Sequence, residues 1–223
     1  MQTPLLLIIS GASGVGKSTM SHKLLKMWET PIILETFDLI REAIRGYESE
    51  KTRSFYTKDY IIDNVNFEGL LNDSSFNLQL NNFLNQCKIL LPALKSICIR
   101  LERKNIPVII EGVNLDPITI LTSNITKNYF SLRSNTIFIN LHISDKIAYK
   151  NQLMRRMQFD QINDTESDYT EKIITRSKEL YDRLEQFIIN NPHQKNIYNI
   201  DISNKDSFNG YINPIVQKII SLI

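Results

Sequence analysis

A glycine-rich segment near the start of the sequence restricts the fold of this chain more than any other part. Residues 11–18 read GASGVGKS, the complete pattern G-x-x-x-x-G-K-[ST]. The apolar run Leu5–Ile9 precedes this segment, and a stretch with helical spacing follows it. Glycines let the backbone curl until several N–H groups point at one anion, and a helix N-terminus adds partial positive charge. The sequence therefore predicts a strand, a phosphate-binding loop and a helix in succession.

Positions within this loop have distinct expected tasks toward ATP and Mg²⁺. Lys17 is expected to reach the β- and γ-phosphates as a catalytic point charge, and the Ser18 hydroxyl suits Mg²⁺. Thr19 can donate a further hydrogen bond to phosphate. A glycine turn with an incidental lysine is the alternative, and the complete pattern in this context disfavours it. The expected nucleotide-binding residues are Gly11, Ala12, Ser13, Gly14, Val15, Gly16, Lys17, Ser18 and Thr19.

Five short apolar runs alternate with segments of helical spacing along the chain. Near-continuous apolar strands between helices are typical of a parallel sheet covered on both faces, so we expect an α/β fold. No repeat, low-complexity tract or Gly/Pro/Ser linker divides the sequence, which predicts a single domain over residues 1–223. The expected strands are Leu5–Ile9, Ile32–Glu35, Val108–Glu111, Ile137–Leu141 and Ile197–Asp201.

Apolar spacing also predicts the helices. One face of the helix after the loop is expected to carry Met20, Leu24, Met27 and Trp28. Pro31 should end that helix, and Pro92 predicts a kink or a break in a later one. The other expected helices are Phe76–Lys104, Ile147–Met157, Tyr169–Ile189 and Pro214–Leu222.

Composition excludes several classes of partner. A net charge of +2 without a block of basic residues argues against nucleic acid. No apolar stretch approaches the length of a membrane span, and the first apolar run lacks the basic segment of a signal peptide, so we expect a cytoplasmic protein. Cys87 and Cys98 form no CxxC pair and are expected to be small buried residues, and the three histidines show no metal-ligand spacing. The sequence assigns no oligomeric state.

Charged residues follow the second expected strand. Asp38 would lie at the carboxyl end of a parallel strand, where ligands bind in such sheets, and its carboxylate could accept a proton from an attacking hydroxyl. Arg41 and Arg45 share one helical face and could clamp an anionic acceptor. Asp38 could instead cap the helix, and the two roles are compatible.

An acidic residue ends the third expected strand. Glu111 resembles the Walker-B carboxylate, which would hold a Mg²⁺-bound water or orient the nucleophile. The alternative is an exposed glutamate at a strand end. Together with Ser18, Glu111 makes up the expected metal site.

Three cations, Lys150, Arg155 and Arg156, precede a polar stretch at residues 158–168. Cations on a lid helix can close over the transferring phosphoryl group, and a solvated helix face is the alternative. Because neighbouring helical residues point about 100° apart, only one of the two arginines should meet the phosphate.

At this point the sequence resembles the 2-phosphoglycerate kinase family of P-loop kinases. The matching stretches spread over the first 120 residues, and the C-terminal third matches loosely. Arg156 is favoured over Arg155 by this match. The stretches are SGASGVGKST (10–19), FDLIREAIRG (37–46), SFY (54–56), FLNQCKILLPALKSI (83–97) and IPVIIEGVNLDP (106–117).

The resemblance implies a P-loop kinase fold with strand order 2-3-1-4-5, a substrate-side helical insertion at residues 46–105 and a lid at 145–170. It implies ATP-dependent phosphorylation of the 3-hydroxyl of 2-phosphoglycerate, giving 2,3-bisphosphoglycerate. Tyr56 and Asn114 would join the substrate side, although the family usually has His where this chain has Asn114. Arg156 would be catalytic, beside Lys17 and Asp38.

Three alternatives remain open on the sequence. The acceptor could be a nucleoside, a sugar or another polyol, or a nucleotide sugar as in zeta-toxin-like kinases. The chain could also be an ATP-binding switch with little turnover. A GTPase is disfavoured, because the sequence lacks an [NT]KxD motif and reads EGVN rather than DxxG after the third strand.

Overall fold

The computed structural model describes residues 4–28, 31–47, 74–131, 135–159, 167–194 and 196–203. Tyr56, the predicted helix at 214–222 and residues 48–73 of the predicted insertion at 46–105 lie outside these residues. The side chain of Arg45 also lies outside them.

All five predicted strands are present in one parallel sheet, in the order β2-β3-β1-β4-β5. This confirms the predicted α/β class and the kinase-type strand order. The first strand runs two residues beyond the predicted Ile9, because Ser10 and Gly11 pair with Asn140 and Leu141 of β4. The strands are β1 (Leu6–Gly11), β2 (Ile33–Thr36), β3 (Val108–Glu111), β4 (Thr136–His142) and β5 (Ile197–Asp201).

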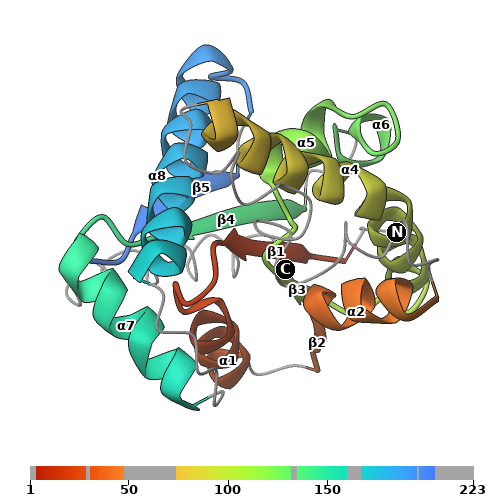
Figure 1. Ribbon diagram of the computed structural model, residues 1–223. Coiled ribbons are helices and arrows are strands. Elements are labelled where there is room, and N and C mark those ends of the chain that lie inside the picture. The colour runs from red at the N-terminus through yellow and green to blue at the C-terminus, as the bar shows by residue number, and fades with distance from the viewer. Residues whose placement is uncertain are drawn as a thin grey trace.

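The central strand β1 is buried along its whole length, and its side chains alternate between two apolar cores. Leu7 and Ile9 belong to the core that includes α1 (Lys17–Met27). Leu6 and Ile8 belong to the core that includes the long helix α4 (Ser74–Glu102). Figure 1 shows α1 on one side of the sheet, and α4, α5 (Pro117–Thr122) and α8 (Ser167–Asn190) on the other.

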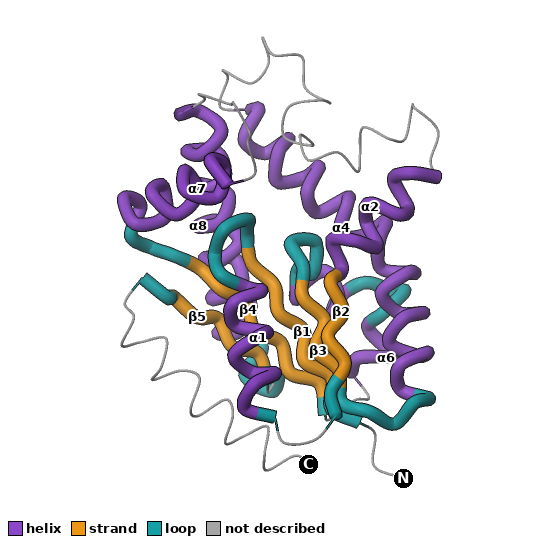
Figure 2. The backbone as a smooth tube through the Cα atoms, turned by 90° about the horizontal axis from the view of Figure 1, so that it is seen from below, coloured by secondary structure: helices purple, strands orange, loops and turns teal. Residues whose placement is uncertain are grey.

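The remaining described helices lie around the ends of the sheet. Figure 2 shows α2 and α7 near one end of the strands, on either side of the loops that follow β1 and β3. These are the carboxyl ends of the strands, where parallel sheets bind ligands. The helices are α2 (Phe37–Tyr47), α6 (Lys127–Ser131) and α7 (Lys146–Phe159).

Helix α4 continues through Pro92, so the predicted alternative of two separate helices is wrong. A proline inside a helix costs about 3 kcal/mol. Leu90, Leu91 and Leu94, which flank the proline, are almost completely buried. Because full burial of each leucine contributes about 1.5–3 kcal/mol, packing against the sheet outweighs the lost hydrogen bond.

Smaller differences arise at helix ends. Met27, expected on the buried face of α1, is 48% exposed, because the helix ends there and the chain becomes extended at Trp28. The two short helices α5 and α6 carry too few residues for a periodic pattern and were not predicted.

Both cysteines are buried and free, as predicted, and burial raises the pKa of the Cys87 thiol. Within the described part of the chain, every helix is too short or too polar to cross a bilayer.

Candidate active site

The predicted phosphate loop joins β1 to α1 in the required backbone conformation. Gly16 caps α1 with a φ of 88°, in the left-handed region that favours glycine. Gly11 has a φ of 135°, and a Cβ there would lie 2.5 Å from the carbonyl oxygen of Leu141. The first turn of α1 contains no acidic residue, so its partial positive charge is available to an anion.

A cavity of about 220 Å³ opens at this helix N-terminus. Its polar lining combines loop residues with two side chains of α7. An arrangement of this kind suits a chain of phosphates, because backbone N–H groups, hydroxyls and cations all face one space. The lining residues are Gly14, Gly16, Lys17, Ser18, Thr19, Gln152 and Arg156.

Lys17 is buried at the bottom of this site, and its Nζ donates a hydrogen bond to the carbonyl oxygen of Ala12 at 3.0 Å. Burial lowers the pKa of Lys17 to about 8. The charges of Asp38 and Glu111 oppose this shift, whereas those of Arg156 and Arg41 add to it. Two predicted carboxylates and two predicted arginines thus influence the charge state of Lys17.

Glu111 is 5% exposed, so the alternative of an exposed strand-end carboxylate is wrong. The Ser18 Oγ donates to its carboxylate, 2.9 Å from Oε1 and 3.1 Å from Oε2. A hydroxyl and a carboxylate facing each other form an oxygen donor pair that fits Mg²⁺, which keeps several waters and takes few protein ligands. Among the described residues, no group of three or more His, Cys, Asp or Glu could hold a metal ion.

Asp38 links α2 to the loop after β3. Its Oδ1 accepts a hydrogen bond from the backbone N–H of Val113 at 3.0 Å. The approach is close because residue 112 is glycine: a Cβ there would lie 2.9 Å from the Cβ of Phe37 and 3.2 Å from Asp38 Oδ1. Asp38 therefore bridges two elements of the site.

Arg41 is buried beside Asp38 on α2, with a side chain 10% exposed. Its Nη1 donates to Asn114 Oδ1 at 3.3 Å, and its Nη2 contacts the Glu42 carboxylate at 2.9 Å. Asn114 donates in turn from Nδ2 to Gln86 Oε1 at 3.1 Å. Sequence reasoning missed Gln86, because its contact with Asn114 joins residues 28 positions apart.

Helix α7 is attached to the phosphate loop. The Tyr149 hydroxyl donates to the Ser13 carbonyl at 2.7 Å, and Gln152 Nε2 donates to the Gly14 carbonyl at 2.6 Å. A Cβ on Gly14 would lie 2.8 Å from a Leu153 methyl carbon. Gln152 had not been predicted, although it stands four residues before Arg156, the spacing of one helical face.

The three cations predicted for a lid, Lys150, Arg155 and Arg156, have different surroundings in the structure. Arg155 and Arg156 are both exposed, and Arg156 is the one that lines the cavity beside Lys17. Lys150 lies 3.9 Å from the Glu171 carboxylate of α8.

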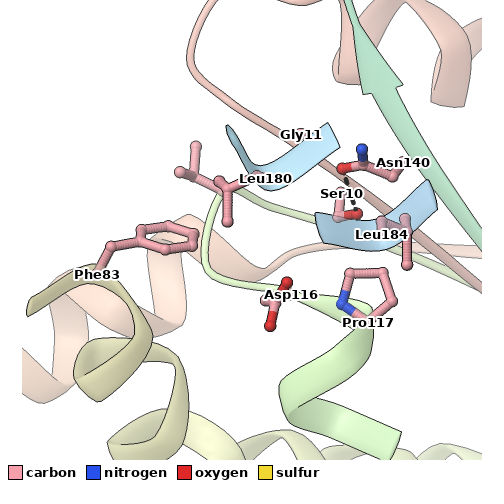
Figure 3. A pocket seen from close by; sticks show the side chains of 9 residues that line it. Ser10, Gly11, Phe83, Asp116, Pro117, Asn140, Leu180 and Leu184 are labelled. Atoms are coloured by element: carbon pink, nitrogen blue, oxygen red, sulfur yellow. Dashed lines mark hydrogen bonds between the residues drawn. The ribbon is translucent and has the colours of Figure 1, made fainter. Parts of the chain in front are cut away.

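A second, smaller cavity lies between β1, α4, α5 and α8 (Figure 3). Its volume is about 10 Å³, enough for a single water molecule at most. Ser10 Oγ donates to Asn140 Oδ1 within it at 3.1 Å. The Asp116 carboxylate accepts from the Thr119 N–H at 2.9 Å and so caps α5. This cavity is part of the packing of the fold rather than a ligand site.

The strand order and the phosphate loop define a protein with the P-loop kinase fold.

In sequence, the chain is 29% identical over 154 residues to the 2-phosphoglycerate kinase of Methanocaldococcus jannaschii. This similarity agrees with the resemblance predicted from the motifs. The match covers 69% of this chain and 46% of that protein, so the chain spans about half the length of this relative. No protein-family profile matches the chain.

Solved structures with related folds include a candidate kinase from Chloroflexus aurantiacus, 14% identical with a TM-score of 0.47 and full coverage of both chains. Another is the shikimate kinase of Bacteroides thetaiotaomicron, 13% identical with a TM-score of 0.41, covering 96% of this chain and 98% of that one. Because these scores lie below 0.5, the fold class is assigned from the strand order and the loop.

Proposed function

We propose that this protein is an ATP-dependent kinase that phosphorylates a hydroxyl of a small phosphorylated acid, most specifically 2-phosphoglycerate. One observation carries the proposal: Asp38, a carboxylate suited to act as a base, and the buried guanidinium of Arg41 both bind the loop that follows β3 and Glu111, through Val113 and Asn114. The charges of both residues also influence the pKa of the P-loop Lys17. A plain nucleotide switch has no need for a base and an anion-binding arginine at this place. The sequence similarity to a 2-phosphoglycerate kinase supports the same acceptor.

In the proposed reaction, the acceptor hydroxyl oxygen forms a bond to the γ-phosphorus and the bond to the β,γ-bridging oxygen breaks, releasing ADP. Asp38 takes the hydroxyl proton, while its other oxygen keeps the contact with Val113. Lys17 moves from the Ala12 carbonyl to the phosphate oxygens, and Arg156 stabilises the transferring group from α7. Ser18 and Glu111 would hold Mg²⁺, which neutralises phosphate charge when it is bound.

The acceptor requires its own cations. 2-Phosphoglycerate carries a phosphate and a carboxylate, and it must approach the γ-phosphate of ATP. Lys17 serves the nucleotide, so Arg41 is the residue proposed to bind the acceptor anion. A planar guanidinium suits phosphate or carboxylate in a forked geometry that a lysine does not reproduce.

Acceptor-dependent ADP release tests the proposal. Purified protein with Mg-ATP is assayed with 2-phosphoglycerate and, in parallel, with plain hydroxy acids, sugars and nucleosides. Turnover with 2-phosphoglycerate supports the assignment. Turnover with an uncharged acceptor alone would support a kinase but contradict 2-phosphoglycerate as its acceptor. If no compound stimulates ADP release, the proposal that the protein is a kinase is wrong.

Arg41→Lys should raise the KM for 2-phosphoglycerate about tenfold or more. Losing one charge-assisted hydrogen bond costs about 1.5–3 kcal/mol, and 1.4 kcal/mol is tenfold. The KM for ATP should hardly move. Steady-state kinetics at saturating ATP measures both, with the exposed Arg100→Lys on α4 as control. An unchanged acceptor KM would contradict this role for Arg41.

Arg156→Ala should lower kcat far more than Arg155→Ala, by about 10- to 100-fold, because a cation near the transferring phosphoryl group acts mainly in the transition state. The two residues are adjacent and both exposed, so they form a matched pair. Equal and small effects on kcat would assign both arginines to a solvated helix face.

ATP binding should take up a proton above about pH 8. Burial lowers the pKa of Lys17 to about 8 in the free protein, and phosphate charge raises it in the complex. Below that pH, Lys17 is already protonated in the free protein, so ATP binds without uptake of a proton at this residue. Above it, affinity should fall as pH rises. Calorimetry in two buffers of different ionisation enthalpy measures the uptake, and Lys17→Arg, whose guanidinium stays protonated, should show none from this position.

A further inference from the structure

A row of three buried polar side chains connects α4 to α2 behind the proposed acceptor site. Gln86 is fully buried, Asn114 is 2% exposed and Arg41 is 8% exposed. Two hydrogen bonds join them: Asn114 Nδ2 to Gln86 Oε1 at 3.1 Å, and Arg41 Nη1 to Asn114 Oδ1 at 3.3 Å. Gln86 has no place in the reaction described above.

The chemistry of the three side chains determines which group donates and which accepts in each of the two hydrogen bonds. A guanidinium can only donate hydrogen bonds, so Asn114 must turn its oxygen toward Arg41. The Asn114 amide nitrogen then faces Gln86, and Gln86 must accept a hydrogen bond from it through its side-chain oxygen. If Gln86 offered no oxygen there, the Asn114 amide could rotate by half a turn, and its N–H₂ would face the guanidinium as donor against donor.

The orientation of Arg41 depends on this row. Nη1 contacts Asn114 and Nη2 contacts Glu42 on the same helix. The Nε–H is buried and has no hydrogen-bond partner within the part of the chain that the structure describes. These two contacts use Nη1 and Nη2, so they fix the plane and the direction of the guanidinium.

We propose that Gln86 is a positioning residue for the acceptor: it sets the Asn114 amide, which orients Arg41 for an anionic substrate. The inference rests on the proposed function, since Arg41 is the acceptor-binding cation there. Gln86 acts through Asn114 and does not itself touch the reacting groups.

The rival explanation is that Gln86 only fills space in the core. Gln86→Met separates the two, because methionine keeps the length and flexibility of the side chain but offers no comparable oxygen. The KM for 2-phosphoglycerate should rise about tenfold, in line with one weakened charge-assisted contact, and the KM for ATP should stay unchanged. Asn85→Met, at the neighbouring exposed amide of α4, is the matched control and should change neither value.

Asn114→Asp makes the test specific. A carboxylate has an oxygen on both sides, so it accepts from Arg41 however it is turned and no longer needs Gln86. The added negative charge of Asn114→Asp changes the acceptor KM by itself. The double variant is therefore compared with the Asn114→Asp single variant rather than with the wild type. In that background, Gln86→Met should raise the acceptor KM no further. An equal rise in both backgrounds would reduce Gln86 to packing and overturn the inference.

Crystal structures of the wild type and of Gln86→Met provide a second measurement that needs no substrate. The variant should lose the contact between Arg41 Nη1 and Asn114 Oδ1. If this contact is lost but the wild type shows no turnover with 2-phosphoglycerate, the proposed function fails and the positioning role stands. If the contact persists and the acceptor KM is unchanged, the positioning role is wrong, whatever the acceptor.

Discussion

Lys17→Ala should abolish measurable phosphoryl transfer. Lys17 is the only residue of the described loop that brings a full positive charge to the cavity at the N-terminus of α1. A charge that stabilises the transition state in a site shielded from water contributes several kcal/mol, so the expected loss in kcat is about 10³-fold or more. ADP release at saturating ATP and acceptor is the measurement.

Two controls separate loss of chemistry from loss of structure. Lys26→Ala removes an exposed lysine from the last turn of the same helix and should keep near wild-type turnover. Thermal unfolding should show that Lys17→Ala folds, because removing a buried ammonium also removes its desolvation cost. If Lys17→Ala kept near wild-type turnover, the interpretation of this loop as the nucleotide site would be wrong.

Asp38→Asn should lower kcat by roughly 10²- to 10⁴-fold while ATP affinity stays nearly intact, because the variant lacks the proposed base. The amide keeps the shape of the carboxylate, and its oxygen can still accept from the Val113 N–H. It cannot accept a proton from the acceptor hydroxyl. Single-turnover kinetics, with ATP binding measured separately by calorimetry, tests this expectation.

The comparison with Asp38→Ala distinguishes the two tasks of this residue. Alanine removes the base and also the contact with Val113, which leaves a backbone N–H without its acceptor. Asp38→Ala should therefore unfold at a lower temperature than Asp38→Asn, although both lose activity. If Asp38→Asn retains wild-type kcat, the role of Asp38 is the structural bridge alone.

The attachment of α7 to the phosphate loop bears on the proposed lid. Tyr149 and Gln152 bind the carbonyl oxygens of Ser13 and Gly14, and Arg156 lies on the same helix. A change in the loop when nucleotide binds would therefore act on the helix that carries Arg156. This supports a lid in the region of residues 145–170, which remains a proposal.

Local patterns were sufficient for much of this protein. Five apolar runs predicted five strands, because consecutive apolar residues are typical of strands in a parallel sheet covered on both faces. GASGVGKS predicted the phosphate loop, because its glycines and its lysine act within eight consecutive positions. The strand order came with the family resemblance, since apolar runs alone do not say which strands are neighbours.

The tertiary structure decided which side chains meet. Ser18 and Glu111 are 93 positions apart, Asp38 and Val113 are 75 apart, and Arg41 and Asn114 are 73 apart. The sequence suggested Asp38, Arg41 and Asn114 singly, and it paired only Ser18 with Glu111, as an expected metal site. The observed contacts arise because parallel strands bring distant strand ends to one edge of the sheet, where α4 also brings Gln86 to Asn114. Hydrogen bonds across that edge leave no periodic signal along the chain.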